Sequence, residues 1–303
     1  MQPFEWVNTV DRTSPLTYMH CSKNIVHPSG VSHEPPHDNS EDCCDCREST
    51  QCVDGQCACA RHTQAMHSRD GLRRRTSSGM TSPPPHNVFI TECNSNCSCH
   101  KWRRRTCLNR VVQRAPVNPN YRLLVFHTGE RGWGALALQS IPAHQYVCEY
   151  IGEVISDTLA ETRSDKFLFS GDARLITNNE WQLPYDPPTI DATQVGHVAR
   201  FINHSCAPNC SVYQVLLDGR DLFKPHFAFF SNRDIAAGQE LTIDYAYTEE
   251  HKKRLFGGPC KCEQCATRER DGGEVEAVGR AVSDGGRRWN ATENGGRKRR
   301  APG

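Results

Sequence analysis

The feature that most constrains this chain is where its cysteines lie. The 303 residues include 17 cysteines, of which ten fall between Cys43 and Cys107 and three between Cys260 and Cys265. The chain starts without the basic and then apolar pattern of a secretory signal, and it lacks an apolar run long enough to span a bilayer. We therefore expect a soluble intracellular protein, in which disulfides do not persist and clustered thiols bind metal.

The first cysteine array has the composition of a zinc cluster. Tetrahedral zinc takes four ligands, so nine thiols cannot serve three ions separately, whereas thiolates that bridge pairs of ions would supply enough ligand positions. A cluster of about three zinc ions therefore fits the count, with single-zinc knuckles and an oxidised disulfide knot as the alternatives. The nine predicted ligands are Cys44, Cys46, Cys52, Cys57, Cys59, Cys93, Cys97, Cys99 and Cys107.

The second array predicts a single zinc site. Cys260, Cys262 and Cys265 supply three thiols, and a closed structural site needs a fourth ligand. Cys206, far away in the sequence, is the candidate. The alternative is that Cys206 is an ordinary buried thiol, in which case the second array lacks its fourth zinc ligand.

The composition and apolar pattern of the remaining sequence change along its length. Residues 61–87 combine an arginine triplet with three consecutive prolines, a composition that predicts a mobile loop. From Tyr121 to Tyr247, short apolar runs separated by turns predict strands, and no long helical period is present. We expect a mostly β fold with short helices, followed by a disordered basic tail over residues 269–303.

Four short motifs follow one another through this β-rich region. They are GWG at 132–134, EYIGE at 149–153, RFINHSCAPNC at 200–210 and ELTIDY at 240–245. Together they resemble the signature of SET-domain protein lysine methyltransferases. The nine-cysteine array is similar to the pre-SET module of that family, and the last three cysteines are similar to its post-SET module. The combination resembles the suppressor-of-variegation class, whose members methylate lysine 9 of histone H3.

The resemblance implies a knot-like assembly of small curved β-sheets, with the zinc cluster packed on one side and a small zinc site at the end. It also implies an organisation into modules. We expect an N-terminal segment at 1–41, a pre-SET zinc-cluster module at 42–115 containing the mobile loop 61–87, a SET domain at 116–248, a post-SET module at 249–268 and the basic tail at 269–303.

The resemblance also implies a cofactor and site residues. Methyl transfer from S-adenosylmethionine is an in-line displacement, so the protein must align two substrates and accept a neutral lysine amine. Tyr245 is implied as the catalytic tyrosine and Tyr150 as a wall of the lysine channel. Arg200 could equally be a structural residue. The implied cofactor-binding residues are Arg131, Gly132, Trp133, Phe167, Arg200, Asn203, His204 and Lys261.

Three features depart from the pattern expected of the class. One is cysteine spacing, since two residues separate Cys262 from Cys265 where four are usual, and the gap from Cys99 to Cys107 is wider than the common three. Phe167 stands where a cofactor-contacting tyrosine is usual, which removes a hydroxyl and keeps a ring. Ile243 stands two residues before Tyr245, where an aromatic residue is usual. In this family a tyrosine hydroxyl at that position is thought to limit methylation, so Ile243 predicts a di- or trimethyl-lysine product.

Charge points to basic partners. Between Glu149 and Asp191 there are nine Asp or Glu against three Lys or Arg, which favours a histone H3 tail as substrate, although a solvated acidic loop has the same composition. A basic run over residues 101–114 could contact nucleosomal DNA phosphates, and the run at 297–300 resembles a nuclear localisation patch. We expect a nuclear, chromatin-associated protein with no membrane partner, located by a targeting protein.

Three functions compete on the sequence alone. The first is an active histone lysine methyltransferase. The second is a zinc-stabilised chromatin-binding module with weak or lost turnover, supported by Phe167 and Ile243. The third, a nucleic-acid-binding zinc protein, leaves the four ordered motifs unexplained.

Overall fold

The computed structural model describes most of the β-rich region and parts of the N-terminal third. It describes residues 5–11, 13–15, 18–26, 44–46, 52, 59, 65–68, 71–76, 79–81, 89–99, 107–114, 121–170, 189–217, 226–247 and 249–270. The predicted ligand Cys57, most of the basic run and the predicted basic tail beyond Arg270 lie outside the described residues.

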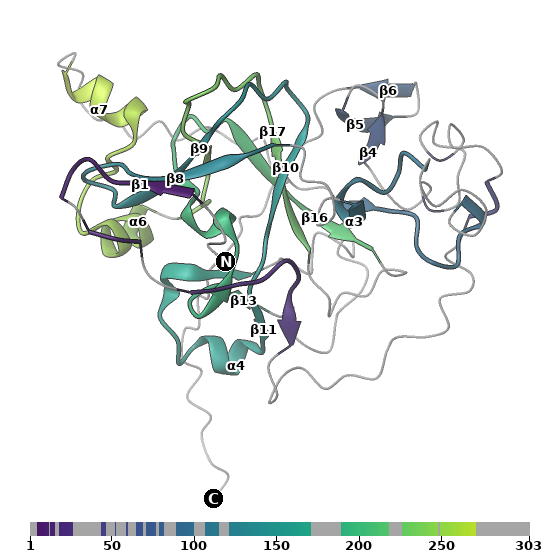
Figure 1. Cartoon of the computed structure of the whole chain (residues 1–303), viewed down its shortest axis with the longest axis horizontal. Coiled ribbons are helices and arrows are strands. Elements are labelled where there is room, and N and C mark those ends of the chain that lie inside the picture. The colour runs from purple at the N-terminus through teal and green to yellow at the C-terminus, as the bar shows by residue number, and fades with distance from the viewer. Residues whose placement is uncertain are drawn as a thin grey trace, which may run out of the picture.

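The fold is mostly β with short helices, as the sequence predicts. The strands β10, β17 and β16 form its centre (Figure 1). In spatial order, the seven-stranded sheet contains β10 (Tyr146–Tyr150), β17 (Phe227–Ser231), β16 (Cys210–Leu216), β7 (Phe89–Thr91), β4 (Ala65–Ser68), β5 (Gly71–Thr76) and β6 (Gly79–Thr81). The parallel pairing of β7 with β16 joins the cysteine-rich region to the central strands.

Smaller sheets surround this one. The three-stranded sheet contains β1 (Glu5–Val7), β8 (Leu123–His127) and β9 (Trp133–Ala137). The four-stranded sheet contains β12 (Leu168–Ser170), β13 (Thr189–Asp191), β11 (Glu153–Ile155) and β3 (Ile25–Val26). Two strand pairs are β14 (Val195–Gly196) with β2 (Met19–His20), and β15 (Asn203–His204) with β18 (Thr242–Ile243).

The helices are short and lie outside the sheets. They are α3 (Val111–Arg114), α4 (Asp157–Ala160), α6 (Glu249–Phe256) and α7 (Glu263–Arg270), with 3-10 turns η2 (Asp165–Phe167) and η3 (Val198–Phe201). In Figure 1, α6 and α7 lie on one side of the central strands, and α3 with β4 to β6 lies on the other. Among the described residues, no helix is both long and apolar enough to cross a membrane.

Two buried clusters pack on the two faces of the central strands. One contains Tyr150, Phe227 and Phe229, and the other contains Tyr146 and Phe230. Neighbouring residues of a strand point to opposite faces, which explains why Phe229 and Phe230 belong to different clusters, and the register shift in β10 between Tyr146 and Cys148 separates Tyr146 from Tyr150. The first cluster continues under the four sequence motifs, so the candidate site is built on a dry, rigid core.

The segment predicted as a mobile loop differs from that expectation. Within 61–87, the described residues form β4, β5 and β6, which pair antiparallel. Leu72 explains why strands form there, because its side chain is 1% exposed and packs with Ile90, Val112 and Tyr146. One buried leucine among arginines thus anchors a hairpin that composition alone did not predict.

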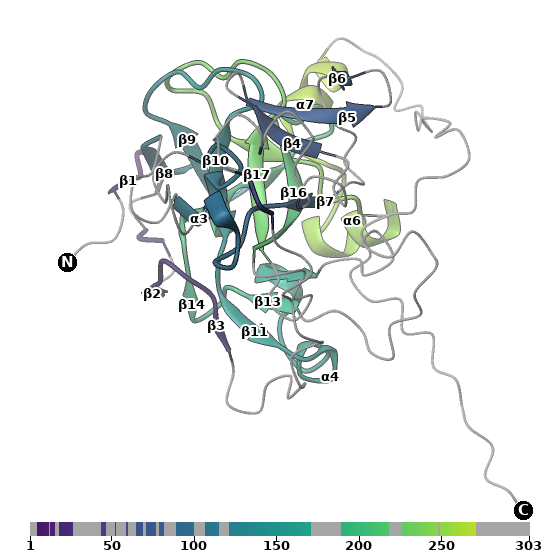
Figure 2. The same cartoon turned by 90° about the vertical axis from the view of Figure 1, so that its right-hand side faces the viewer.

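The N-terminal segment follows the surface as successive edge strands. Each of its strands pairs in parallel with a different sheet: β1 with β8, β2 with β14 and β3 with β11. Figure 2 shows β2 and β3 along the same side as β14 and β11. Parallel partners cannot be joined by a tight turn, so each of these pairings joins stretches that lie far apart in the sequence.

Candidate active site

A cavity of about 420 Å³ lies where four distant stretches of the chain meet. Small-molecule sites typically occupy roughly 300–1,000 Å³, so this cavity has the size of a cofactor site. All eight residues that the resemblance implied for cofactor binding line it, and so does Tyr245. The full lining is Glu130, Arg131, Gly132, Trp133, Lys166, Phe167, Arg200, Phe201, Asn203, His204, Tyr245, Tyr247, Leu255, Phe256, Cys260, Lys261 and Cys262.

The parallel pair of β15 and β18 brings two of the motifs together. In its register, Asn203 lies opposite Thr242 and His204 lies opposite Ile243. The motif at 240–245 and the motif at 200–210 are therefore adjacent in space. Tyr245 follows the end of β18 and reaches the cavity from there.

Glu240 holds one wall of the cavity together. Its carboxylate accepts hydrogen bonds from Arg131 Nη1 at 3.0 Å and Nη2 at 2.6 Å, and from Asn203 Nδ2 at 3.0 Å. Asn203 Nδ2 also donates to the carbonyl oxygen of Trp133 at 3.1 Å. Sequence reasoning placed Glu240 in a motif but gave it no role. A bidentate carboxylate fixes the arginine side chain, so Glu240 positions both Arg131 and Asn203.

The turn before Trp133 needs its glycines. Gly132 has φ 70°, a left-handed conformation that favours glycine. A Cβ on Gly134 would lie 2.7 Å from Thr128 Cγ2 and 2.8 Å from Glu240 Oε1. Glycine at these two positions lets the backbone approach both the cavity and the carboxylate.

Arg200 is a buried cation at the back of the cavity. It is 6% exposed, and its guanidinium carbon lies 4.0 Å from the ring centroid of Phe167, 4.5 Å from Tyr18 and 5.2 Å from Phe201. Nη2 donates to the carbonyl oxygen of Thr193 at 3.4 Å. Within the described part of the chain, Nε and Nη1 have no hydrogen-bond partner.

These unpartnered donors indicate a ligand. Burial lowers the pKa of the Arg200 guanidinium, but arginine stays charged in proteins, so a positive charge with two unpartnered donor atoms lies in the wall of the cavity. Buried polar groups are normally hydrogen-bonded, and leaving them unpartnered is costly. An anionic ligand in the cavity would give the Arg200 charge a partner.

His204 and Tyr245 are held in one arrangement. The backbone N–H of Tyr245 donates to His204 Nδ1 at 3.2 Å, so the neutral ring carries its proton on Nε2. The His204 ring stacks on Phe256 of α6, with centroids 5.7 Å apart. The hydroxyl of Tyr245 donates to the carbonyl oxygen of Ile202 at 2.9 Å. Burial raises the pKa of the Tyr245 phenol, which keeps it neutral.

Tyr150 and Ile243 lie behind this wall. Neither is among the described residues that line the cavity, but both belong to the buried cluster against which Tyr245 packs. The Tyr150 hydroxyl donates to the carbonyl oxygen of Phe167 at 2.7 Å, and its ring lies 5.0 Å from that of Phe169. Burial raises the pKa of Tyr150 as well. The two tyrosines are therefore neutral, aromatic and fixed.

A cluster of four cysteines borders the cavity, and two of them line it. The sulfurs of Cys206, Cys260, Cys262 and Cys265 all lie within 4.8 Å of one another, with Cys206 3.9 Å from Cys260 and 3.7 Å from Cys265. Zinc–sulfur bonds of about 2.3 Å in a tetrahedron place sulfurs about 3.8 Å apart, so the set fits zinc. Because Cys260 and Cys262 line the cavity, a metal here would fix its wall.

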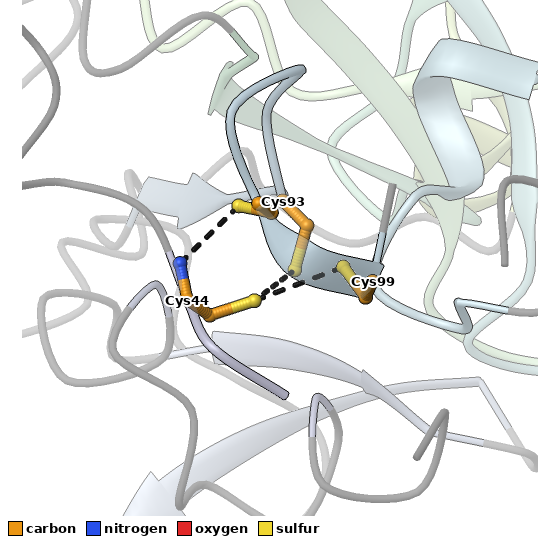
Figure 3. A group of neighbouring side chains, drawn as sticks. Cys44, Cys93 and Cys99 are labelled. Carbon is orange, nitrogen blue, oxygen red and sulfur yellow. Dashed lines mark hydrogen bonds between the residues drawn. The ribbon is translucent and has the colours of Figure 1, made fainter. Parts of the chain in front are cut away.

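The N-terminal cysteines form overlapping sets. Cys44, Cys93, Cys97 and Cys99 form one set and Cys52, Cys93, Cys99 and Cys107 another, while Cys44, Cys46 and Cys52 form a third. The sulfur of Cys44 lies 3.9 Å from that of Cys93 and 3.7 Å from that of Cys99 (Figure 3). Cys59 joins through Cys97 at 3.4 Å. Shared members between the sets are what bridging thiolates of a multinuclear zinc cluster require.

Comparison with known proteins agrees with this geometry. The family model described as the SET domain matches residues 132–246, and the model described as the pre-SET motif matches residues 1–110. The chain belongs to the SET-domain family. Its SET region therefore contains the cavity walls from Gly132 to Tyr245, and its pre-SET region contains the overlapping cysteine sets.

Relatives with curated names are considerably longer than this SET protein. The mouse histone-lysine N-methyltransferase EHMT1 is 37% identical over 267 residues, which is 87% of this chain and 19% of that protein. The Xenopus tropicalis histone-lysine N-methyltransferase SUV39H2 is 39% identical over 205 residues, 67% of this chain and 45% of that protein. The chain thus spans less than half the length of these two relatives.

Solved structures share the fold. KRYPTONITE, in a complex described as containing methylated DNA, an H3(1-15) peptide and SAH, superposes with a TM-score of 0.60 at 29% identity, covering 81% of this chain and 45% of that one. DIM-5 from Neurospora superposes with a TM-score of 0.61 at 24% identity, covering 81% of this chain and 96% of that one, and supports the fold alone.

Several SET-domain residues at the cavity had no assigned role in the sequence. Tyr247 packs edge-to-face on Tyr245 with centroids 5.3 Å apart, and Leu255 and Phe256 come from α6. Glu130 forms an ion pair with Lys261 at 3.4 Å, between the turn before Trp133 and the last three cysteines. The aromatic residues Tyr245, Tyr247 and Phe256 were the signal available in the sequence.

Proposed function

We propose that this chain is an S-adenosylmethionine-dependent protein lysine methyltransferase that acts on histone H3, with lysine 9 as its target. One observation carries the proposal. The cavity combines a buried cation with open donors, the Asn203–His204 pair and Tyr245, and the residues come from four separate stretches. The names of the relatives and the ligands in the description of the KRYPTONITE structure support the same chemistry.

The residues present suit the cofactor. S-adenosylmethionine supplies a methyl group already activated by a sulfonium, together with an amino-acid end and a purine. Arg200 offers a positive charge to the carboxylate, and Asn203 with the Arg131–Trp133 turn would hold polar groups nearby. The stacked rings of His204 and Phe256 offer a flat apolar surface for a base. Proximity of this kind supplies much of the rate of a displacement reaction.

Tyr245 and Tyr150 would prepare the lysine. A free lysine has a pKa near about 10.4, so the site must disfavour the ammonium ion, and a desolvated aromatic channel does this. The Tyr245 hydroxyl donates its hydrogen bond to the carbonyl oxygen of Ile202, so the lone pairs of the hydroxyl oxygen can accept a hydrogen bond from the amine. Tyr150, tied to Phe167, keeps the neighbouring wall in place.

Ile243 would set the product. Its side chain is buried beside Tyr245 and has no group that can hold an amine or a water. A methylated amine becomes progressively less polar, and an aliphatic neighbour carries no polar group that must be desolvated. We therefore propose di- or trimethyl-lysine as the product.

The names of the relatives, rather than the described acidic residues, support a histone tail as substrate. Glu149 and Asp191 are buried, Glu149 lies 2.5 Å from His226, and Arg163 contacts Glu153 at 3.5 Å and Asp191 at 3.0 Å. We further propose a nuclear, chromatin-bound protein that a targeting partner brings to its site. Contact of its basic residues with nucleosomal DNA phosphates is part of the same proposal.

The test is methyl transfer from radiolabelled S-adenosylmethionine to core histones. We expect label on histone H3, and far less label with the Tyr245→Phe protein at matched zinc content. Binding of the cofactor without transfer would favour the weak chromatin-binding module. Absence of both binding and transfer would contradict the proposal.

A further inference from the structure

The N-terminal segment supports two walls of the cavity from behind. Trp6 packs edge-to-face on Trp133, with centroids 5.7 Å apart and an interplanar angle of 83°. Tyr18 lies with its ring 4.5 Å from the guanidinium carbon of Arg200 and 5.9 Å from the ring of Phe201. Trp133, Arg200 and Phe201 line the cavity, whereas the described lining contains no residue of the N-terminal segment.

We propose that Tyr18 is a positioning residue of the cofactor site, which holds the Arg200 guanidinium in the orientation that binds the anionic end of the cofactor. This inference rests on the proposed function and adds a residue to it. Tyr18 acts through Arg200, since it is itself outside the cavity lining given by the described residues.

Arg200 needs such support because hydrogen bonds hold it weakly. Among the described residues, the hydrogen bond it makes is the 3.4 Å bond from Nη2 to Thr193. Three aromatic rings lie 4.0–5.2 Å from the guanidinium carbon, and Asp191 adds an electrostatic attraction. A guanidinium over an aromatic face is attracted by the ring quadrupole, and the attraction is strongest where water is excluded. Removing the Tyr18 ring would therefore leave the guanidinium less firmly held in the cavity wall.

The backbone fixes Tyr18 beside Arg200. Directly after it, Met19 N donates to Gln194 O at 2.8 Å and Cys21 N donates to Gly196 O at 2.9 Å. These bonds attach β2 to β14, the strand that leads into the 3-10 turn carrying Arg200. The pairing of β2 with β14 therefore keeps the Tyr18 ring close to the Arg200 guanidinium.

The first test is cofactor affinity by titration calorimetry on the full chain. Tyr18→Leu, which keeps apolar bulk and loses the aromatic face, should raise the Kd for S-adenosylmethionine about five- to thirtyfold. Tyr18→Phe should bind like the unmutated protein. Met19→Ala is the matched control, because the neighbouring Met19 side chain is 61% exposed. In turnover, the KM for cofactor should rise with Tyr18→Leu while kcat at saturation stays unchanged.

Hydrogen exchange gives a second test that needs no variant. If Tyr18 supports cofactor binding, the cofactor must stabilise the N-terminal segment in return, because coupling between sites is reciprocal. Exchange of the Met19 and Cys21 amides should therefore slow when S-adenosylmethionine is added. Unchanged exchange would overturn the inference even if Tyr18→Leu failed to fold.

The outcomes separate the two proposals. If the unmutated chain binds cofactor and Tyr18→Leu binds equally well, the role of Tyr18 is refuted and the proposed function stands. If the unmutated chain binds no cofactor, the proposed function fails and the role of Tyr18 falls with it.

Discussion

Replacing Glu240 tests the architecture of the cavity most sharply among single substitutions. Its carboxylate accepts two hydrogen bonds from Arg131 and one from Asn203. Glu240→Ala removes all three and leaves the arginine charge unpaired. Glu240→Gln keeps the shape and an acceptor oxygen for Asn203, but loses the charge and the bidentate contact. The two variants therefore separate packing from charge.

The structure sets the size of the effect. Arg131 and Glu240 are 23% and 18% exposed, so solvent weakens their attraction, and the pair contributes about 1 kcal/mol rather than the larger value of a fully buried pair. The bond from Asn203 adds about 1 kcal/mol. We expect Glu240→Ala to lower the free energy of unfolding by about 2 kcal/mol, and Glu240→Gln by about 1 kcal/mol.

Thermal unfolding and calorimetry measure this effect. At about 2–4 °C per kcal/mol, Glu240→Ala should lower Tm by about 4–8 °C. It should also weaken S-adenosylmethionine binding about tenfold, because the wall formed by Arg131 and Asn203 is no longer fixed. Asp234→Ala is the control, since this exposed carboxylate accepts a single hydrogen bond from the backbone N–H of Ala143. If Glu240→Ala changed neither Tm nor Kd beyond the control, the role assigned to Glu240 would be wrong.

Metal analysis of the purified protein should find about four zinc ions, three in the pre-SET cluster and one in the post-SET site; a value near one would exclude the cluster. A strong chelator should abolish the proposed methyl transfer and loosen the N-terminal third of the chain, and retained transfer after complete zinc removal would contradict a metal-fixed cavity wall. Tyr245→Phe should lose most turnover with nearly unchanged cofactor affinity, measured by steady-state kinetics and calorimetry, and an unchanged rate would refute its catalytic role. Ile243→Tyr should shift the product towards monomethyl-lysine without abolishing activity. Mass spectrometry reports that distribution, and exclusive monomethylation by the unmutated protein would assign product control elsewhere.

The cysteine arrays and the ordered motifs carried most of what the sequence could predict. Clustered cysteines in a protein without a secretory signal mostly bind metal, so the two cysteine clusters followed from spacing. The mostly β class followed from the short apolar runs separated by turns. The structure places Cys206 with the last three cysteines, as the sequence predicted, because one ligand was missing from that set. The same sequence patterns could not reveal the β15–β18 pairing, since each strand has two residues and no readable period.

Features that depend on long-range packing escaped sequence reasoning. Tyr18 is an isolated aromatic with no motif around it, and its contact with Arg200 exists only once β2 lies on β14. Glu240 resembles any acidic residue at a turn until its neighbours are known. The hairpin within 61–87 depends on burial of Leu72 in a cluster with residues from four other strands and a helix, which local propensity does not report.

The most direct measurement of the central claim is tandem mass spectrometry of a histone H3 tail peptide after long incubation with the protein and S-adenosylmethionine. The account predicts two or three methyl groups on lysine 9 and none on a peptide in which that lysine is replaced by alanine. Stoichiometric zinc and bound cofactor, with no methylated lysine on any histone, would contradict it.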